Sequence, residues 1–314
     1  MTAGGIAFPF FVGCDRSGTT LLLAMFTAHP EMAIPPESHF IVRMTKQRYK
    51  YEEEPFRTDL FVDDLRRHER FPRWGLPLDA VERELEAAPP GDLASAFRTV
   101  YGLYAREKGK PRYGDKTPDY VRNVPLLADL FPEAVFVHVI RDGRDVALSL
   151  LDVEWGPQTM ADAAFFWRSR IRHGRAAGER LGPRRYMELR YESLVEQPEE
   201  ELRKLCEFTG IEFDRAMLDY ARNAEAVAAG ALVPEAHGNL DKPLQSDLRD
   251  WRSQMRGHDV ALFETIAGPQ LEELGYERTA RSLGPGVRTL ARARWAVIGA
   301  RRAAARTKRV LKRR

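Results

Sequence analysis

Eight consecutive residues near the start of this 314-residue sequence combine glycines, hydroxyl groups and an arginine in an order suited to binding an anion. The segment Gly13-Cys-Asp-Arg-Ser-Gly-Thr-Thr20 follows a short apolar run. Its glycines let the backbone curl so that N–H groups point inward, and the next helix adds the positive end of its dipole. Arg16 supplies a fixed charge that can grip a phosphate with two parallel hydrogen bonds. The other residues expected to bind the anion are Ser17, Gly18, Thr19 and Thr20.

The loop has the Gly-x-x-x-x-Gly frame of a Walker A motif, with Thr19 in the place of its lysine. In enzymes that cleave ATP or GTP, that lysine bridges the β- and γ-phosphates. The loop is therefore suited to an anion but poorly equipped for triphosphate cleavage. Two alternative interpretations stay open at this point. One is a nucleotide kinase or NTPase with an altered loop, and the other is a non-catalytic nucleotide-binding protein.

A second anion-binding pair follows the strongest predicted strand, residues 134–140 with the sequence AVFVHVI. Arg141 comes directly after this strand, at the edge of a parallel sheet where ligands bind. Ser149 lies eight residues further on, about two turns into the next predicted helix. A guanidinium at the strand end and a hydroxyl on the helix can then converge on one anion. We expect Arg144 and Asp145 only to pair locally on the helix surface.

Two anion sites after two strands suit a ligand with phosphates at both ends of an adenosine. With these two motifs the sequence resembles the sulfotransferases that use 3′-phosphoadenosine 5′-phosphosulfate (PAPS), most of all the branch with protein-tyrosine sulfotransferases and many bacterial relatives. The resemblance covers roughly residues 6–42 and 113–278. It implies that residues 16–20 bind the 5′-phosphosulfate end of the donor and that Arg141 and Ser149 bind its 3′-phosphate. It further implies in-line transfer of a sulfuryl group from PAPS, as co-substrate, to a hydroxyl acceptor.

In-line sulfuryl transfer needs a base that removes the acceptor proton and a cation at the bridging oxygen of the donor. The resemblance assigns the base to Glu37, which follows two prolines shortly after the predicted first helix. His39 is the rival, because cytosolic sulfotransferases use a histidine as base. The closer branch has an arginine at that place, so His39 departs from its pattern. A metal is less necessary here than in phosphoryl transfer, because a sulfuryl group carries less charge, and we expect none.

Three lysine and tyrosine positions complete the predicted site. Lys116, in Gly-Asp-Lys-Thr-Pro, is implied to be the cation at the bridging oxygen, with Asp115 as a residue that orients it. Tyr191, in Arg-Tyr-Glu-Ser-Leu, either packs near the nucleotide or belongs to the core. Lys242 precedes a tryptophan as the family's late lysine does, and is implied to cap the donor phosphates from the loop at residues 224–247.

The pattern of apolar runs predicts an α/β fold, a three-layer P-loop-like structure with a central parallel sheet flanked by helices. Residues 31–42 are expected to be extended or irregular, and residues 113–117 to form a short turn. The predicted strands are residues 6–12, 134–140 and 186–189. The predicted helices are residues 19–28, 124–131, 144–151, 161–181, 199–210, 247–256 and 259–274.

The predicted domain organisation is one sulfotransferase domain, residues 1–282, followed by a tail at residues 283–314. The domain contains a highly charged helical insertion at about residues 43–112, with two helices near 79–87 and 92–108. We expect the insertion to cover a site. Because members of the family share least in their acceptor-binding segments, the acceptor pocket is expected to be built largely from the insertion and from loops such as residues 152–160.

The C-terminal tail is strongly basic, whereas the rest of the chain is net acidic. The tail has eleven basic residues and no acidic one, which leaves 38 basic and 46 acidic residues in the rest of the chain, although the whole chain has a net charge of +3. Apolar residues recur opposite the arginines, as in a helix that lies on a membrane surface. Peripheral contact with a membrane is one interpretation of the tail, and a solvated terminus is the other.

Location and partners follow from what the sequence contains. Its two cysteines, Cys14 and Cys206, form no disulfide scaffold, and no Cys/His cluster has metal-ligand spacing. No signal peptide pattern is present, and the apolar runs are too short to span a bilayer, so we expect a cytoplasmic protein, with the membrane's inner face as the tail's target. No nucleic-acid partner is expected. The acceptor stays open between a small phenol, a carbohydrate, a glycolipid and a peptide tyrosine, and so does the oligomeric state.

Overall fold

The computed structural model of the chain describes residues 7–223, 250–281, 283–287, 289 and 293. These residues form two compact units. The first comprises the described parts of Met1–Ile140 and His173–Ser246, and the second comprises those of Arg141–Arg172 and Asp247–Arg314. Lys242 lies outside the described residues, as does most of the basic tail, so both expectations stay predictions. The domain boundary expected at residue 283 also stays a prediction.

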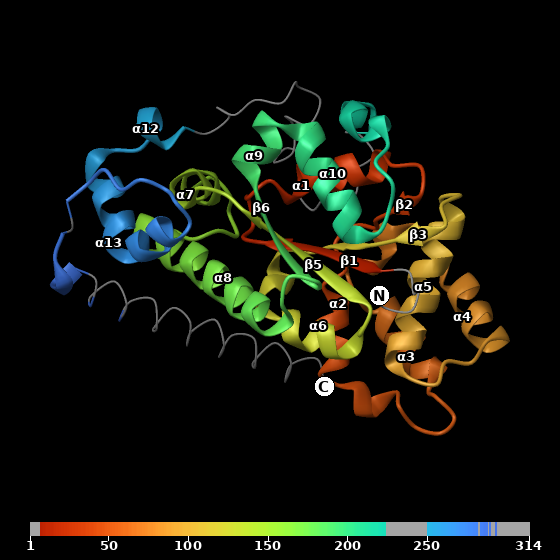
Figure 1. Cartoon of the computed structure of the whole chain (residues 1–314). Coiled ribbons are helices and arrows are strands. Elements are labelled where there is room, and N and C mark those ends of the chain that lie inside the picture. The colour runs from red at the N-terminus through yellow and green to blue at the C-terminus, as the bar shows by residue number, and fades with distance from the viewer. Residues whose placement is uncertain (1–6, 224–249, 282, 288, 290–292, 294–314) are drawn as a thin grey trace. The chain divides into compact units, whose positions relative to one another are not determined.

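The first unit is built on a sheet of four parallel strands in the order β4–β1–β5–β6 (Figure 1). This order and direction confirm the predicted parallel α/β sheet. The strands are β1 (Phe8–Gly13), β4 (Asp115–Lys116), β5 (Ala134–Ile140) and β6 (Tyr186–Arg190). The expectation of a turn at residues 113–117 was wrong, because Asp115 and Lys116 pair with Phe10 and Phe11 as an edge strand. Two residues are too short for a periodic signal in the sequence.

Both faces of the sheet are covered by apolar side chains, which makes the three layers. On β1, Phe8, Phe10 and Val12 belong to one hydrophobic cluster, while Phe11 belongs to another. Residues of a strand alternate between the two faces of a sheet, so each cluster marks one face. A strand buried on both sides needs a continuous apolar run, and β5, which is buried throughout, has one.

Helices cover the two faces of the sheet (Figure 1). The helices on the Phe11 face are α1 (Thr19–Ala28), α9 (Tyr191–Glu196), α10 (Pro198–Thr209) and η4 (Arg215–Asn223). Those on the Phe10 face include α2 (Phe40–Thr45), α5 (Leu93–Glu107), η3 (Pro118–Arg122) and α6 (Val124–Leu130). A two-stranded parallel pair, β2 (Met32–Ala33) with β3 (Arg112–Tyr113), lies beside them. Residues 31–39 are extended or irregular as expected, with β2 as the extended part, and only α2, which begins at Phe40, departs from the expectation for residues 31–42.

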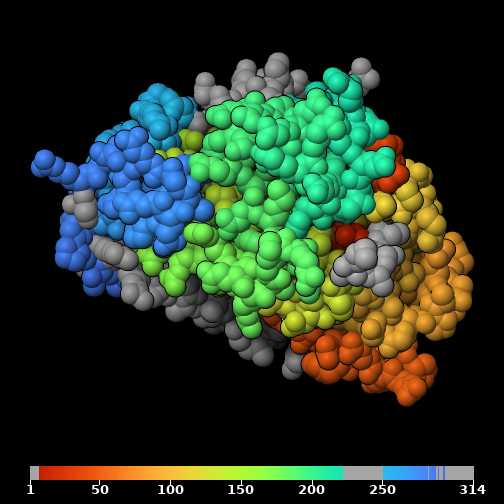
Figure 2. All heavy atoms as spheres, in the orientation of Figure 1, coloured from red at the N-terminus to blue at the C-terminus, as the bar shows by residue number. Residues whose placement is uncertain are grey.

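The charged insertion contains more helix than expected. Besides α4 (Leu78–Ala87) and α5, it has α3 (Thr58–Arg66) and the short helices η1 (Arg48–Lys50) and η2 (Phe71–Trp74). Helix α3 buries Phe61, Val62 and Leu65, whose spacing forms one apolar face, although charged residues outnumber them in the sequence. The insertion forms the orange and gold block of Figure 2 and shares the cluster on the Phe10 face.

The second unit packs around a buried arginine. Its elements are α7 (Gly143–Leu151), the first part of α8 (Met160–Leu181), α12 (Trp251–Gln254) and α13 (Gly257–Glu273). Arg144 donates to Asp142 and Glu264, both at 2.7 Å, and its guanidinium stacks on Trp251. The expectation that Arg144 pairs with Asp145 on the helix surface was therefore wrong. A buried guanidinium is tolerated here because two carboxylates neutralise and bind it.

No helix in the described part of the chain is both long enough and apolar enough to cross a membrane.

Lys110 ties the end of α1 to the segment that follows it. Its ammonium donates to the carbonyl oxygens of Thr27 at 2.6 Å, His29 at 2.9 Å and Met32 at 3.0 Å. The Thr27 and His29 carbonyls lie at the C-terminus of α1, where backbone acceptors lack partners and a cation is favourable, and the Met32 carbonyl belongs to β2.

We predict that Lys110→Met lowers the urea midpoint of unfolding. The free energy of unfolding should fall by about 1–3 kcal/mol, because the carbonyls that Lys110 contacts lose a charged donor. The neighbouring Lys108→Met is the control. Its exposed ammonium lies 5.5 Å from the ring centre of Tyr104, and we expect its removal to cost at most about 0.5 kcal/mol. Equal losses in the two variants would contradict the anchoring role of Lys110.

Candidate active site

The predicted phosphate loop joins β1 to α1 and needs its two glycines. A side chain at Gly13 would meet the carbonyl oxygen of Val139 at 2.6 Å, so the close approach of β1 to β5 excludes any Cβ there. Gly18 caps α1 with φ of 92°, in the left-handed region that favours glycine. No side chain caps α1 and no acid lies in its first turn, so the first N–H groups of this ten-residue helix remain suited to an anion.

Arg16 and Ser17 lie inside this loop in unusual states. Arg16 has φ of 71°, and only one other non-glycine residue in the described part of the chain, His39, has positive φ. Such strained backbone concentrates at binding sites, where the surrounding structure enforces it. The Ser17 hydroxyl is fully buried, and it has no hydrogen-bond partner among the described residues. A buried hydroxyl without a partner is costly, so a bound oxyanion is a reasonable partner for it.

Tyr191 packs its ring directly on the loop. A Cβ built at Gly18 would fall 2.1 Å from Cδ2 of Tyr191. The ring therefore occupies the space that any side chain at position 18 would need. The sequence left two roles open for Tyr191, and the structure places it in the core against the loop that is expected to bind the nucleotide.

The predicted base and cation form an ion pair. Lys116 Nζ lies 2.7 Å from Glu37 Oε1, although 78 residues separate them along the chain. Strand β4 positions Lys116 beside Phe11, two residues before the phosphate loop begins. Because parallel strands end at the same edge of a sheet, Lys116 and the loop lie at the carboxyl edge where ligands bind. The Lys116 side chain is only 5% exposed, whereas Glu37 is 27% exposed.

Two more cationic or polar groups contact the other oxygen of Glu37. His39 Nε2 lies 2.9 Å from Glu37 Oε2 and must donate there, since a carboxylate only accepts. Arg70 Nη1 donates to the same oxygen at 3.3 Å. Arg70 comes from the helical insertion, just ahead of η2, and no motif in the sequence distinguishes it from its charged neighbours. Its place in a run of charged residues was the only signal, and such runs are usually solvated.

The charges around Glu37 determine its protonation. Burial raises the pKa of Glu37, but the Lys116 ammonium and the His39 imidazole outweigh it and hold the pKa well below the ordinary value of 4.5. The carboxylate is therefore fully ionised at neutral pH. In this arrangement Glu37 is ready to accept a proton but is a weak base, because its partners favour the charged form.

A buried polar network fixes the two segments that carry this pair. The Ser38 hydroxyl lies 2.8 Å from the Tyr120 hydroxyl, and the Ser38 N–H donates to the Thr117 hydroxyl at 3.1 Å. The Tyr120 hydroxyl also accepts from the Ile41 N–H at 3.2 Å. Ser38 follows Glu37, and Thr117 follows Lys116, so these hydrogen bonds keep the segments that carry Glu37 and Lys116 next to each other.

Asp115 does not orient Lys116. Consecutive strand residues point to opposite faces of a sheet, and Asp115 accepts a hydrogen bond from the Tyr101 hydroxyl of α5 at 2.6 Å. Burial raises the pKa of this carboxyl. Asp115 instead fastens β4 to the helical layer beneath it.

The second predicted anion site belongs to the second unit. Arg141 follows β5 and is nearly buried, with Nη2 3.9 Å from Asp145 Oδ2 one turn along α7. Ser149 lies further along the same helix and is also buried. Asp145 accepts the backbone N–H of Trp251 at 2.8 Å. Arg141 thus lies just before α7 and Ser149 lies on it, and their convergence on one anion stays a prediction.

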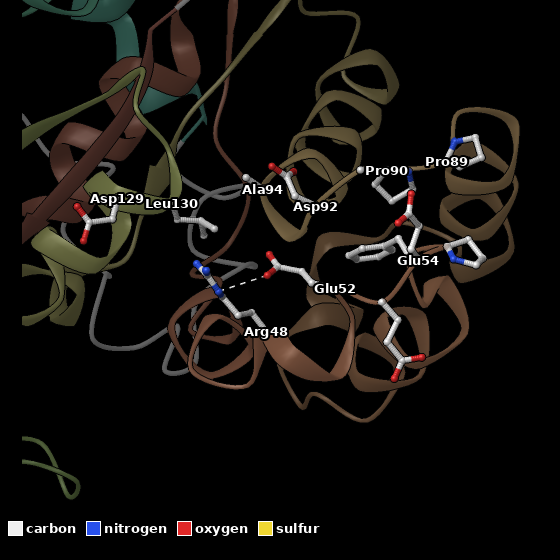
Figure 3. Close-up of a pocket in the computed structure, with 13 residues that line it drawn as sticks. Arg48, Glu52, Glu54, Pro89, Pro90, Asp92, Ala94, Asp129 and Leu130 are labelled. Atoms are coloured by element: carbon white, nitrogen blue, oxygen red, sulfur yellow. Dashed lines mark ion pairs between the residues drawn. The ribbon is translucent and has the colours of Figure 1, made fainter.

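A large hollow in the first unit lies among other residues. It has a volume of about 830 Å³ and is lined by η1, the segment after it and the turn before α5 (Figure 3). None of the predicted site residues lines it. Its carboxylates are Glu52, Glu53, Glu54, Asp92 and Asp129, and Arg48 pairs with Glu52 at 3.3 Å. An anionic nucleotide would be repelled there, so this hollow is not a donor site.

The model of the sulfotransferase family matches residues 9–215. The chain belongs to the sulfotransferase family. This confirms the resemblance seen in the sequence, and the match includes the insertion, which that resemblance left out. As a sulfotransferase the chain is an enzyme of sulfuryl transfer.

Two relatives of this sulfotransferase illustrate the similarity. Protein-tyrosine sulfotransferase A of Caenorhabditis elegans is 25% identical over 283 residues, covering 87% of this chain and 68% of the relative. The nodulation protein NoeE of Sinorhizobium fredii is 26% identical over 299 residues, covering 86% of this chain and 66% of the relative. The chain thus spans about two thirds of the length of each.

Solved structures confirm the fold of this sulfotransferase. The sulfotransferase domain of the curacin biosynthetic pathway has a TM-score of 0.57 at 20% identity, covering 88% of this chain and 100% of that domain. The sulfotransferase domain of the Synechococcus PCC 7002 olefin synthase has a TM-score of 0.56 at 24% identity, covering 83% of this chain and 94% of that domain.

We predict that Glu37→Gln lowers the urea midpoint of unfolding at neutral pH. The free energy of unfolding should fall by about 1–2 kcal/mol, because Lys116 loses its carboxylate partner. The folded-state pKa of Glu37 lies below its unfolded value. The ionised carboxylate therefore makes its full contribution to the free energy of unfolding above the ordinary pKa. That contribution is lost as the pH falls from the ordinary pKa through the lower folded-state pKa. The difference between Glu37→Gln and wild type should shrink as unfolding is measured at progressively lower pH.

Glu31→Gln is the matched control, because Glu31 makes one ion pair, with Arg112 at 3.2 Å, and is 48% exposed. Its effect should be small at every pH. A pH-independent difference between Glu37→Gln and wild type would show that Glu37 and Lys116 are not coupled in solution.

Proposed function

We propose that this chain transfers the sulfuryl group of PAPS to a hydroxyl acceptor, with Glu37 as the base and Lys116 as the cation at the leaving oxygen. The observation that supports this best is the 2.7 Å ion pair between these two side chains at the carboxyl edge of β4. A base and a cation are the two groups that the reaction needs. Their segments are fastened together by the hydrogen bonds of Ser38 with Thr117 and Tyr120.

In the proposed reaction Glu37 takes the proton of the acceptor hydroxyl while the acceptor oxygen attacks sulfur. The bond between sulfur and the bridging oxygen breaks on the opposite side, and its electron pair stays on that oxygen. Lys116 neutralises the charge that develops there. The products are a sulfate ester and adenosine 3′,5′-bisphosphate. Positioning and charge stabilisation supply most of the catalysis, as in phosphoryl transfer.

Donor binding would change the ion pair. The bridging oxygen of PAPS needs Lys116, and the donor places several negative charges near it. As the ammonium turns to the donor, Glu37 loses the partner that most strongly lowers its pKa. The carboxylate then becomes a stronger base at the moment when a donor is present. The pair therefore serves as a resting state that opposes proton removal without donor.

The remaining donor contacts are assigned from the family resemblance. The loop residues Arg16, Ser17, Gly18, Thr19 and Thr20 would bind the 5′-phosphosulfate, and Tyr191 supports the loop at Gly18. Arg141 and Ser149 would bind the 3′-phosphate, and Lys242 would cap the donor phosphates. The unpartnered hydroxyl of Ser17 and the uncapped start of α1 support the loop assignment.

The acceptor is proposed only as a class. The relatives named above include a protein-tyrosine sulfotransferase, and another relative, 33% identical over 127 residues, is the mouse carbohydrate sulfotransferase 7. A peptide tyrosine or a carbohydrate hydroxyl is therefore a suitable first acceptor to test. Peripheral membrane contact through residues 283–314 stays a proposal that rests on their basic sequence.

We predict that the wild-type chain is stabilised against heat by PAPS and moves labelled sulfate to at least one acceptor among tyrosine peptides, carbohydrates, glycolipids and phenols. Glu37→Gln should bind the donor but lose turnover by about 10²- to 10⁴-fold, since it lacks the general base. His39→Ala should lose less.

Absence of PAPS binding up to millimolar concentrations would reject the proposal, and Mg²⁺-dependent ATP turnover would favour a kinase or NTPase instead. Unchanged turnover in Glu37→Gln together with a large loss in His39→Ala would transfer the base role to His39.

A further inference from the structure

The two oxygens of the Glu37 carboxylate have different partners. Oε1 accepts from Lys116 at 2.7 Å, and that is its only partner among the described residues. Oε2 accepts from His39 at 2.9 Å and from Arg70 at 3.3 Å. One oxygen of the carboxylate thus contacts Lys116, which the donor would bind. The other oxygen contacts His39 and Arg70, which the donor does not require.

Arg70 is fixed against the segment that carries Glu37. Directly after Arg70, η2 buries Phe71 and Trp74. Both rings pack on Phe40, with ring centres at 5.9 Å and 5.3 Å, and Phe40 follows His39. The Arg70 side chain is only 17% exposed. The packing of η2 on Phe40 therefore places the Arg70 guanidinium beside the Glu37 carboxylate.

We propose that Arg70 is a positioning residue that holds Glu37 through Oε2 and leaves Oε1 as the oxygen that takes the acceptor proton. This rests on the proposed function, because it requires Lys116 to leave Oε1 for the donor. The Oε2 hydrogen bonds then fix the rotation of the carboxylate while Oε1 becomes accessible. A base held in one orientation removes a proton more efficiently than one that rotates.

The charged groups around this contact set the direction of the effect. Lys116 from β4, His39 from its own segment and Arg70 from the insertion face Glu37. Besides Glu37, three charged neighbours influence Arg70, which are Arg73, Glu69 and Asp15. Loss of the Arg70 guanidinium removes a positive charge that lies beside the Glu37 carboxylate, and this raises the pKa of Glu37. Because turnover needs ionised Glu37, the acid limb of the pH profile should move to higher pH.

The test compares Arg70→Met with wild type at saturating PAPS and with an acceptor that the wild type sulfates. We expect kcat to fall by roughly tenfold or more and its acid limb to move up by about one pH unit, with donor affinity unchanged. Arg70→Lys should restore part of kcat and return the limb towards wild type. Arg67→Met, which removes an exposed arginine paired with Asp63, is the control and should leave both unchanged.

A double-mutant cycle makes the inference independent of how well Arg70→Met folds. In the Glu37→Gln background, Arg70→Met should cause no further loss of kcat, and the two changes should be non-additive in the pH dependence of unfolding. Full additivity in both measurements would overturn the inference. So would a rise in acceptor KM with kcat and the acid limb unchanged, because Arg70 would then bind the acceptor.

These outcomes separate the inference from the function on which it rests. If the wild-type chain neither binds PAPS nor transfers sulfate, the proposed function fails. The unfolding cycle then still decides whether Arg70 and Glu37 are coupled, since it needs no substrate. If the wild type is active and the cycle is additive, only the inference fails.

Discussion

The contact between Glu37 and Lys116 is the constraint on which the rest of the site depends. Two opposite charges, one of them almost fully buried, lie 2.7 Å apart at the edge of the central sheet. The Lys116 ammonium would not be stable there without Glu37, because a buried ion without a partner costs several kcal/mol. The short strand β4, the prolines before Glu37 and the hydrogen bonds of Ser38 all serve to bring these two side chains together.

The phosphate loop obeys a different constraint, which is space. The backbone of β5 excludes a side chain at Gly13, and the ring of Tyr191 excludes one at Gly18. The positive φ of Arg16 and His39 shows backbone strain on both sides of the predicted chemistry. Strain of this kind is kept where a defined geometry is useful.

Much of this arrangement could be predicted from the sequence. Helix α1 and strand β5 have the predicted bounds, because the first is a mostly apolar stretch that ends at His29-Pro30 and the second is a short, continuous, β-branched run. Glu37 and Lys116 were predicted from short motifs, and they do meet. Their direct contact was not predicted, because no local pattern reports a pairing across 78 residues.

What the sequence could not reveal depended on tertiary contacts. Strand β4 has two residues and no period, so it resembled a turn. Arg144 resembled a surface residue, yet it is neutralised by Glu264, 120 residues away. Arg70 belongs to a run that is charged throughout, and only the packing of Phe71 and Trp74 on Phe40 directs it to Glu37. In each case the deciding partner is distant in sequence.

A crystal structure of the chain with adenosine 3′,5′-bisphosphate bound would test the central claim most directly. The decisive measurement is the distance from Lys116 Nζ to Glu37 Oε1 and to the 5′-phosphate of the nucleotide. The account predicts that Lys116 leaves Glu37 and lies within hydrogen-bond distance of a 5′-phosphate oxygen, while His39 and Arg70 still contact Oε2. A nucleotide bound with the 2.7 Å ion pair intact, and with no contact from Lys116, would contradict it.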